Sequence, residues 1–243
     1  MKALEGTTMP ALVLSLGLAV AGLFIGHGFS AGRARDRFVE VKGLAEREVT
    51  ADLALWPLRY VTTGNDLSVA QAQISRSTQQ ILTFLGRHGI DTSAVQLQAL
   101  EVSDADANRF PGERAGPRFV IQQTVMVRWP KPEVVLAASQ RVSELVAAGV
   151  VLSSSGEYGT GGPTFVFTRL NQLKPSMVAE ATANAREAAE QFAKDSRTAL
   201  GGIRQASQGI FVILPRDQAP GISESSQLQK TVRVVSTVQY FLK

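Results

Sequence analysis

Residues 38–63, FVEVKGLAEREVTADLALWPLRYVTT, combine alternating apolar side chains with two breaks, and the rest of the sequence is interpreted from this stretch. Val39 and Val41 alternate with charged residues, and apolar side chains return on every second position from Val49 to Leu55. An alternation of period two is typical of a strand with one buried face. The stretch therefore predicts a long β-strand.

At Pro57 the apolar phase of this strand changes, because Leu58 and Tyr60 occupy positions of the opposite parity. Proline has no N–H to give to a β-ladder, and one extra residue moves every later side chain to the other face of the sheet. We therefore expect a β-bulge at Pro57, in a strand that lies close to a sheet edge.

The composition of the chain excludes several kinds of chemistry. Of the 243 residues, 44% are hydrophobic, which is ample for a buried core, and none is cysteine, so disulfides and thiolate sites are excluded. The net charge of +4 is mildly basic, but Lys and Arg are dispersed except at Arg33, Arg35 and Arg37. Nucleic-acid binding needs a concentrated basic patch, so we predict no nucleic-acid partner.

Residues 10–29, PALVLSLGLAVAGLFIGHGF, are long and apolar enough for a membrane helix, and His27 is their one ionisable group. A helix of about 20 residues spans the ~30 Å hydrocarbon layer. The run is either an uncleaved anchor or a signal peptide. Signal cleavage needs small residues at two positions before the cut, and residues 30–34 supply them poorly. We therefore favour an anchor formed by residues 1–37.

Small residues within this run favour association between helices. Gly22 and Gly26 form a GxxxG motif, and Gly17 lies one turn and a half earlier. Such spacing lets a neighbouring helix approach closely. Glycine is also common in membrane helices that have no such partner, so both interpretations stay open.

The rest of the chain predicts three units, each a helix followed by a β-hairpin. The expected helices cover residues 67–85, 135–149 and 175–194, and the expected hairpins cover residues 95–129, 150–168 and 210–242. This order predicts an α+β fold in which three helices pack on a mainly antiparallel sheet. The hairpin tips at residues 103–118 and 215–228 are longer than a turn requires.

Details of two helices follow from their ends and faces. Ser68 with Gln71 three residues later predicts a capping box at the start of the first helix. Pro175 suits the first turn of the third helix, whose apolar stripe includes Val178 and Phe192.

No set of side chains completes a metal site. The run from Asp104 to Asn108 begins like a calcium loop, but Arg109 stands where glycine must turn the chain and Ala115 where a bidentate glutamate is needed. The two histidines, His27 and His88, are too far apart in sequence to suggest a zinc site or a catalytic triad.

A catalytic acid and base could come from Glu46, Glu48 and Asp52, but charges at a strand bend more often form a solvated face. We therefore predict a protein without enzymatic activity, without a cofactor and without a bound metal.

The opening stretch resembles the SIMPL-domain family, the YggE-like proteins of bacterial envelopes. The matching positions are Val39, Val41, Gly43, the run Glu48–Val49–Thr50–Ala51–Asp52 and the exit Gly64–Asn65–Asp66. One departure is Ala51, where the family usually has proline. The resemblance extends over residues 38–243 and implies a single SIMPL-like α+β domain after the anchor.

This resemblance also implies a function. It implies a non-enzymatic envelope protein that is associated with defence against oxidative stress and assembles into rings. It further implies a single-pass protein of the bacterial inner membrane whose large domain faces the periplasm. The basic residues that follow the apolar run instead favour a cytoplasmic domain by the positive-inside rule, since only Lys2 precedes it. We follow the resemblance.

We expect the contacts between subunits at the long strand and at the hairpin tips. The candidate residues are Trp56, Pro57 and Tyr60 at the strand edge and Phe110 in the first tip. An exposed edge pairs readily with another chain, and anchors held in one bilayer raise the local concentration of identical domains. Two other functions stay open: an extracytoplasmic module that binds a lipid or small molecule, and a carboxylate-dependent hydrolase.

Overall fold

The computed structural model describes residues 8–34, 37–107, 116–153 and 162–243. The chain folds as two compact units. The first unit comprises Met1–Glu46, Pro175–Phe211 and Arg233–Lys243, and the second comprises Arg47–Lys174 and Val212–Val232. Both contain antiparallel strands and helix, so the predicted α+β class is confirmed. Each unit is described by itself.

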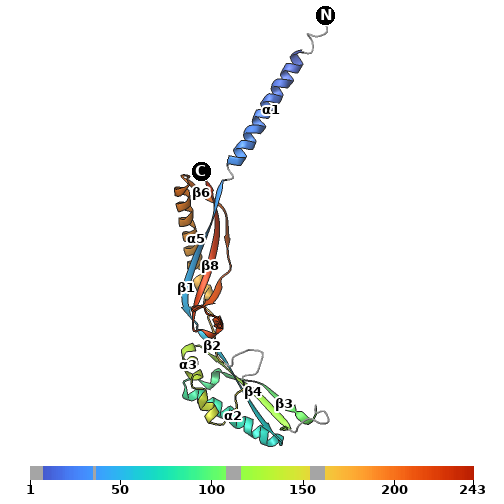
Figure 1. The fold of residues 1–243 in the computed structure, drawn as a ribbon, viewed down its shortest axis with the longest axis vertical. Helices are drawn as coiled ribbons and strands as arrows, with labels where there is room; N and C mark the ends of the chain where they lie inside the picture. The colour runs from blue at the N-terminus through green and yellow to red at the C-terminus, as the bar shows by residue number, and fades with distance from the viewer. Residues whose placement is uncertain (1–7, 35–36, 108–115, 154–161) are drawn as a thin grey trace. The chain divides into compact units, whose positions relative to one another are not determined.

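The sheet of the first unit has the strand order β1-β8-β6, and β7 also pairs with β8 (Figure 1). Strand β6 (Leu200–Gln208) and most of β1 (Phe38–Thr50) and β8 (Gln229–Leu242) belong to this unit, whereas the residues of β7 (Val212–Pro215) belong to the second. Helix α5 (Leu170–Asp195) runs alongside this sheet in both ribbon views. In β1 the buried side chains alternate as predicted, with Val39 in the core and Val41 partly buried against it.

Helix α5 lies unusually close to strand β1. Its buried side chains are Met177, Ala181, Ala185, Ala189 and Ala193. Opposite them is Gly43, where an added Cβ would lie 1.8 Å from the carbonyl oxygen of Ala181. The amide of Asn184 also donates to the Leu44 carbonyl at 2.8 Å. The helix backbone therefore rests directly on the backbone of the strand.

This close approach corrects the predicted face of the third helix. The helix begins at Leu170, with Pro175 inside it, and Phe192 is 49% exposed. Ala181 and Ala185 of the expected stripe are buried, but Met177, Ala189 and Ala193 are buried in place of the expected Val178, Ala188 and Phe192. A row of alanines fits because a phenylalanine between helix and strand would hold the two backbones apart.

The sequence interpretation also missed a strand. Strand β6, LGGIRQASQ, pairs antiparallel with β8 although it has no alternation of apolar side chains. Ile210, expected in the last hairpin, lies outside any strand and is 83% exposed. The partner of β8 is therefore formed by two strands, β6 and β7, instead of one.

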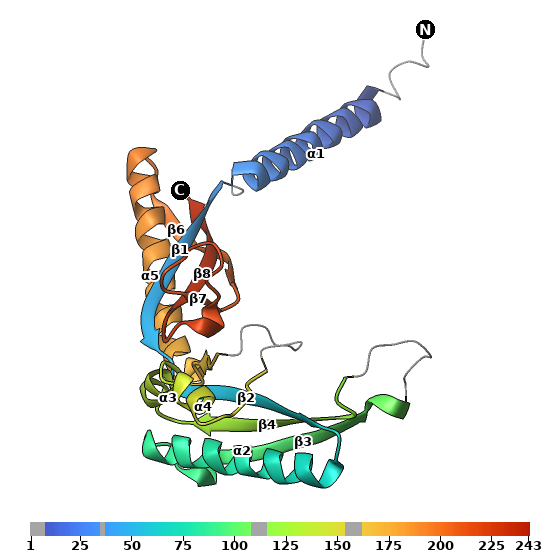
Figure 2. The same ribbon diagram turned by 60° about the horizontal axis from the view of Figure 1, so that its bottom comes forward.

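The second unit has a sheet of strand order β3-β4-β2-β5. Its strands are β2 (Leu53–Gly64), β3 (Val95–Asp104), β4 (Phe119–Trp129) and β5 (Thr164–Val166). Helices α2 (Leu67–Arg87), α3 (Pro132–Ser139) and α4 (Ser143–Ala147) belong to the same unit (Figure 2). Strand β2 is paired with β4 without a register shift, from Ala54↔Trp129 to Gly64↔Phe119.

The core of this unit forms between the sheet and its helices. Trp56 and Tyr60 project from β2 into the core, where the Trp56 ring lies edge-on to Phe84 of α2 at 6.5 Å. The Tyr60 hydroxyl lies 2.6 Å from Thr78 Oγ1 and donates to Gln123 Oε1 at 2.9 Å. Helix and strand are thus joined by apolar contact and by a buried hydrogen-bond network.

The expected bulge at Pro57 is wrong. Strand β2 passes Pro57 in register, and it lies inside the sheet between β4 and β5 instead of at an edge. Even-numbered side chains are buried from Ala54 onward, so the phase changes at the junction before β2. Arg59 and Val61 bond to the segment 151–153, and Pro57 has the same parity. The backbone of Pro57 therefore points away from β4, and the lack of an N–H at this residue removes no hydrogen bond between β2 and β4.

Other boundaries differ from the expected ones. The N-cap of α2 is Asp66, not Ser68, because Asp66 Oδ1 accepts the N–H groups of Ser68 and Val69 at 2.8 and 3.0 Å. The second helix is divided into α3 and α4. The second hairpin is absent, because Leu152 and β5 each pair with β2 instead of with each other.

Helix α1 (Thr8–Ala34) includes residues 10–29, the run that the sequence predicts to be a membrane helix. Among the residues that the structure describes, no helix is long and apolar enough to cross a membrane. A Cβ added at Gly17, Gly22 or Gly26 would meet nothing within 4 Å. The anchor and its association through glycines stay predictions.

Candidate functional site

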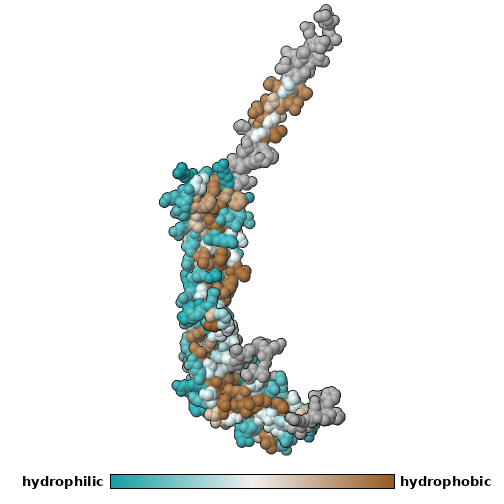
Figure 3. All heavy atoms as spheres, viewed as in Figure 1, coloured by the Kyte–Doolittle hydropathy of each residue, from teal (hydrophilic) through white to brown (hydrophobic). Residues whose placement is uncertain are grey.

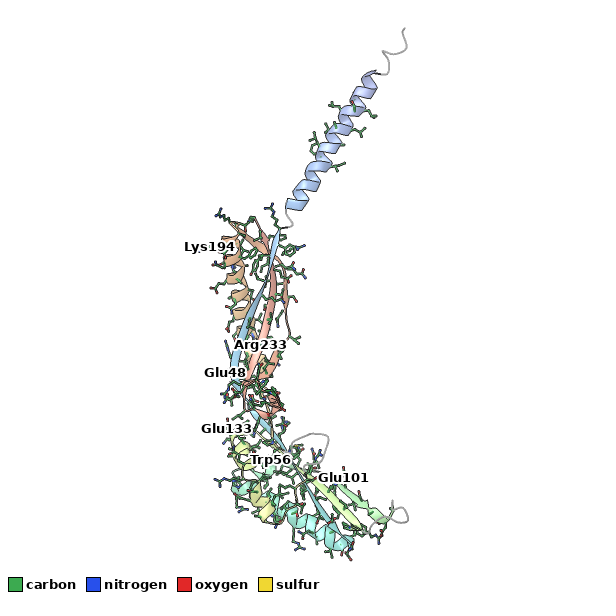
Figure 4. The ribbon with its side chains drawn as sticks, viewed as in Figure 1. Glu48, Trp56, Glu101, Glu133, Lys194 and Arg233 are labelled. Atoms are coloured by element: carbon green, nitrogen blue, oxygen red, sulfur yellow. The ribbon has the colours of Figure 1, made fainter. Side chains whose placement is uncertain are left out.

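Two of the three carboxylates proposed as an acid–base group form ion pairs with different arginines. Asp52 Oδ1 accepts the N–H of Thr168 at 2.9 Å, and Arg169 Nε lies 2.8 Å from Asp52 Oδ2. Glu46 forms an ion pair with Arg233, and Glu48 is exposed (Figure 4). The structure therefore does not bring these three groups together as a catalytic pair.

The Asp52 side chain, just before β2, binds Thr168 and Arg169 in the segment between β5 and α5. This side chain is 13% exposed. Burial alone raises the pKa of Asp52, but hydrogen bonds from Thr168 and Arg169 and the charge of Arg169 hold this pKa below its ordinary value. A carboxylate stabilised in its ionised form is a poor general base, so its role here is to hold the chain between β5 and α5.

The residues of the calcium-like run bind an arginine. Arg118 Nη2 lies 3.0 Å from Asp104 Oδ2, and Arg118 Nε lies 3.3 Å from Asp106 Oδ2. Asn108 and Arg109 lie outside the described residues. Over the described ranges, no group of three or more His, Cys, Asp or Glu residues could hold a metal ion.

The residues proposed as subunit contacts are mostly core residues. Trp56 is 1% exposed and Tyr60 is fully buried, so their side chains fill the core and offer no surface to a partner. Pro57 is half-buried, and Phe110 lies outside the described residues. The predicted edge contact therefore has to be sought elsewhere.

Strand β6 offers such a surface. The sheet order places β6 at an edge, and its residues 202–208 are all exposed, with Ile203 at 56%. Side chains on both faces of the strand are therefore accessible. The Arg204 guanidinium lies 4.1 Å from the centre of the Phe38 ring, where it forms a cation–π contact.

Two glycines hold this open strand to its neighbour. A Cβ added at Gly201 would lie 2.9 Å from the Phe241 carbonyl oxygen, and one at Gly209 would lie 2.7 Å from that of Val235. The N–H of Gly209 donates to the same Val235 carbonyl at 2.8 Å. Glycines near both ends of β6 therefore permit its close pairing with β8, and they are the one sequence signal that could have located the strand.

The backbone of β6 points alternately toward β8 and away from it. Gly209 donates to β8, and the register is continuous from Gln205↔Gln239 to Gln208↔Ser236. The odd-numbered residues of this segment thus bond β8, while Ala206 and Gln208 direct their N–H and C=O groups outward. An outward row of donors and acceptors is a template for a further strand.

Over the part of the chain that the structure describes, these observations define an α+β protein with two antiparallel sheets and an exposed edge strand. The chain belongs to the SIMPL family, whose model, described as a protein of unknown function (DUF541), matches residues 39–240. This match confirms the family predicted from the opening stretch. A comparison with the curated proteins finds no match.

Proposed function

We propose that this protein is a membrane-anchored, non-enzymatic protein of the bacterial envelope that assembles with copies of itself through the open edge of β6. The observation that carries the proposal is the exposure of residues 202–208 in a strand whose outward backbone groups can pair with another strand. On the basis of the SIMPL resemblance, we further propose that the assembly is a ring and that its role is defence against oxidative stress.

We propose that the protein is not a catalyst because several of its carboxylates form ion pairs within the fold. Asp52, Glu46 and Asp104 each have a basic partner within the fold: Arg169, Arg233 and Arg118 respectively. Their charges are thus engaged in holding segments of the chain. A general base needs a pKa near the working pH and access to substrate, and Asp52 has a lowered pKa.

The anchor is proposed from the apolar surface of α1. Eight large apolar side chains between Val13 and Ile25 are 45–75% exposed, and Figure 3 shows apolar residues along the helix. A helix that is apolar all round needs an apolar environment, and residues 10–29 have the length that a bilayer requires. Following the resemblance, we place the domain from Phe38 onward in the periplasm.

Anchoring of the subunits in one membrane explains how a weak edge contact can be sufficient for assembly. Anchors in one bilayer hold identical domains at high local concentration, so that pairing between subunits becomes effectively intramolecular. Strands β6 and β1 lie at opposite edges of the same sheet. If β6 of one subunit pairs with β1 of the next, the contact joins two different surfaces. A heterologous contact of this kind, repeated by rotation, closes into a ring.

The test is cross-linking in membranes with variants of one outward-facing residue. Ala206→Pro removes an N–H from the open edge while leaving the bonds to β8, so the cross-linked ladder should shorten. Ala206→Ser keeps the N–H and should give the same ladder as the unaltered protein. A single monomer band at every cross-linker concentration, or equal ladders for both variants, would refute assembly through this edge.

Two further measurements test the anchor and its orientation. The mass of the membrane-extracted protein should include residues 10–29, and a mature protein that starts near Gly32 or Ala34 would contradict the anchor. A reporter fused after Lys243 should be active only outside the cytoplasm; activity confined to the cytoplasm would contradict the periplasmic placement.

A further inference from the structure

One end of the first unit brings together the start of β1, the end of α5 and the end of β8. The Leu242 N–H donates to the Arg37 carbonyl at 2.9 Å, and Lys243 and Ala199 exchange two backbone hydrogen bonds at 2.8 and 3.0 Å. Ala199 follows α5, whose last turn contains Lys194 (Figure 4). We call this the anchor-side end of the unit, and it comprises residues 37–38, 192–199 and 241–243.

The chain connects this end closely to the run that is proposed as the anchor. Helix α1 continues from residue 29 to Ala34, and residues 35–37 separate Ala34 from Phe38. At 1.5 Å per helical residue and at most about 3.6 Å per extended one, Phe38 lies within about 22 Å of the end of the apolar run. The headgroup layer alone is about 5–8 Å thick. A bilayer that holds α1 is therefore within reach of the anchor-side end.

Exposed cations predominate at this end. Arg37, Lys194 and Arg197 are all exposed, and Asp195 has the only acidic side chain in these residues, all of which the structure describes. Glu190, one turn before Lys194, forms an ion pair with the arginine four residues earlier in α5. The surface next to the anchor is thus positively charged.

The backbone at Arg197 is an independent observation. Its φ is 55°, and it is the one residue other than glycine with a positive φ in the described ranges. The Thr198 N–H donates to the Ala193 carbonyl at 2.9 Å and the Arg197 N–H to the Lys194 carbonyl at 3.2 Å, which is the Schellman motif. Glycine is the usual residue at this position of the motif, because its lack of a Cβ avoids strain.

An arginine at a glycine position calls for an explanation beyond the fold. The dipole of α5 favours a cation near its last turn, but Lys194 already provides one there. Residues held in strained backbone conformations are concentrated at sites where the side chain has a function. The guanidinium of Arg197 therefore points to a negatively charged ligand at this end.

We propose that the anchor-side end binds the headgroups of anionic phospholipids in the membrane that holds α1. Lipid phosphates would accept charge-assisted hydrogen bonds from Arg37, Lys194 and Arg197. Phe192, which is 49% exposed one turn before Ser196, would enter the boundary between headgroups and acyl chains. The anchor keeps this end and the headgroups at high local concentration, so each contact can be weak.

This inference rests on the proposed anchor and adds a consequence for assembly. Lipid contacts at the anchor-side end would hold the first unit in one orientation on the bilayer. The β6 edges of neighbouring subunits would then lie at the same height above the membrane, where they can pair.

The experiment uses the full-length protein in nanodiscs of phosphatidylcholine, alone or with about one-third phosphatidylglycerol. Because the chain has no cysteine, Ala199→Cys provides a single site for a dye whose emission rises in a membrane interface. The emission should increase with phosphatidylglycerol and fall again in about 0.5 M salt. Arg197→Gly and Lys194→Gln should each lower the docking constant about fivefold, the contribution of one basic residue at an anionic surface. Phe192→Ser should lower it at both salt concentrations.

Two controls separate lipid binding from folding and from general charge. Glycine suits the φ of residue 197 better than arginine, so Arg197→Gly should keep or raise the unfolding temperature while it weakens docking. Lys42→Gln makes the same charge change as Lys194→Gln on the same unit, at an exposed residue about 16 Å from Arg37 along β1. It should change the docking constant less than twofold.

The possible failures are distinguishable. Equal emission in the two lipids, or equal weakening by Lys42→Gln and Lys194→Gln, would overturn the lipid contact and leave the anchor standing. Full displacement by inorganic phosphate would reduce the end to a site for any anion and would overturn it as well. A protein that does not enter nanodiscs would refute the anchor and this inference together, whereas failure of the β6 variants would affect neither.

Discussion

Replacing Gly43 by alanine tests the closest contact in the first unit. The added Cβ would lie 1.8 Å from the Ala181 carbonyl oxygen and 2.5 Å from the Ala185 nitrogen. Both are backbone atoms, so no side chain can rotate away. Because a carbon and an oxygen normally approach to about 3.3 Å, α5 has to move away from β1 locally by about 1.5 Å.

The cost follows from the contacts that this movement loosens. The helix buries four alanines and Met177 against the sheet. At about 0.8 kcal/mol per buried methyl-sized group, with about 2 kcal/mol for the methionine, this packing contributes about 5 kcal/mol. A gap of 0.5–1 Å already removes a quarter to a half of the dispersion energy. Gly43→Ala should therefore lower the free energy of unfolding by about 1–3 kcal/mol.

Urea unfolding followed by circular dichroism measures this loss, and hydrogen exchange of the α5 amides shows whether it originates at the helix. Gly202→Ala in β6 is the matched control, because a Cβ there meets nothing within 4 Å. Its unfolding free energy should change by less than about 1 kcal/mol. Equal unfolding midpoints and equal α5 exchange for the two variants would refute the close-packing argument.

Two further changes test the buried charges of the second unit. Asp52→Asn should lower the unfolding free energy by about 1–2 kcal/mol at pH 7. Since the folded pKa of Asp52 is below its unfolded value of about 3.9, this contribution is present above that pH and disappears as the pH falls through the folded pKa. The urea midpoints of the two proteins should thus converge in acid, and a constant difference down to about pH 2 would contradict this role of Asp52. Lys230 is fully buried and its Nζ donates to the Glu224 carbonyl at 2.6 Å and to the Glu224 carboxylate. Glu224→Ala should destabilise the protein by about 1–3 kcal/mol more than Lys230→Met, because the first leaves a buried ammonium and the second leaves a carboxylate that water can reach; urea midpoints in the reverse order would contradict this.

Local periodicity was sufficient to predict several elements. Val39 alternates with exposed residues in β1, and Ile74, Ile81 and Leu85 occupy the buried face of α2. The hairpin of β3 and β4 was also predicted, since both strands carry their own alternation. These elements bury one face against the rest of their unit, so the pattern of side chains contains the necessary information.

The position of β2 in its sheet could not be predicted in this way. Alternation shows that one face is buried but does not show which strands flank it. Odd-numbered side chains are buried in β1 and even-numbered ones from Ala54 onward. The change of phase falls at the junction between the two strands, whereas Pro57 suggested a later position. A proline fits in β2 because Pro57 has the parity of Arg59 and Val61, whose backbone groups bond to the segment 151–153 and not to β4.

The candidate site was only partly predictable for a related reason. The sequence indicated a strand edge as the contact surface, and the structure contains one, but it is β6 and not the strand that holds Trp56. Trp56 and Tyr60 were expected at a contact because the strand that contains them was expected at a sheet edge. Here they fill the core, and the exposed edge consists of small and polar residues without periodicity.

Glycine and alanine have a common role throughout the first unit. Gly43 admits the backbone of α5, and Gly201 and Gly209 admit carbonyl groups of β8. Backbone proximity thus replaces large side chains at these three contacts. A sheet held in this way gains stability when its open edge acquires a further strand, because new hydrogen bonds and new apolar contacts form together. Assembly at β6 should therefore raise the unfolding temperature of the first unit, and Ala206→Pro should remove that increase while Ala206→Ser retains it.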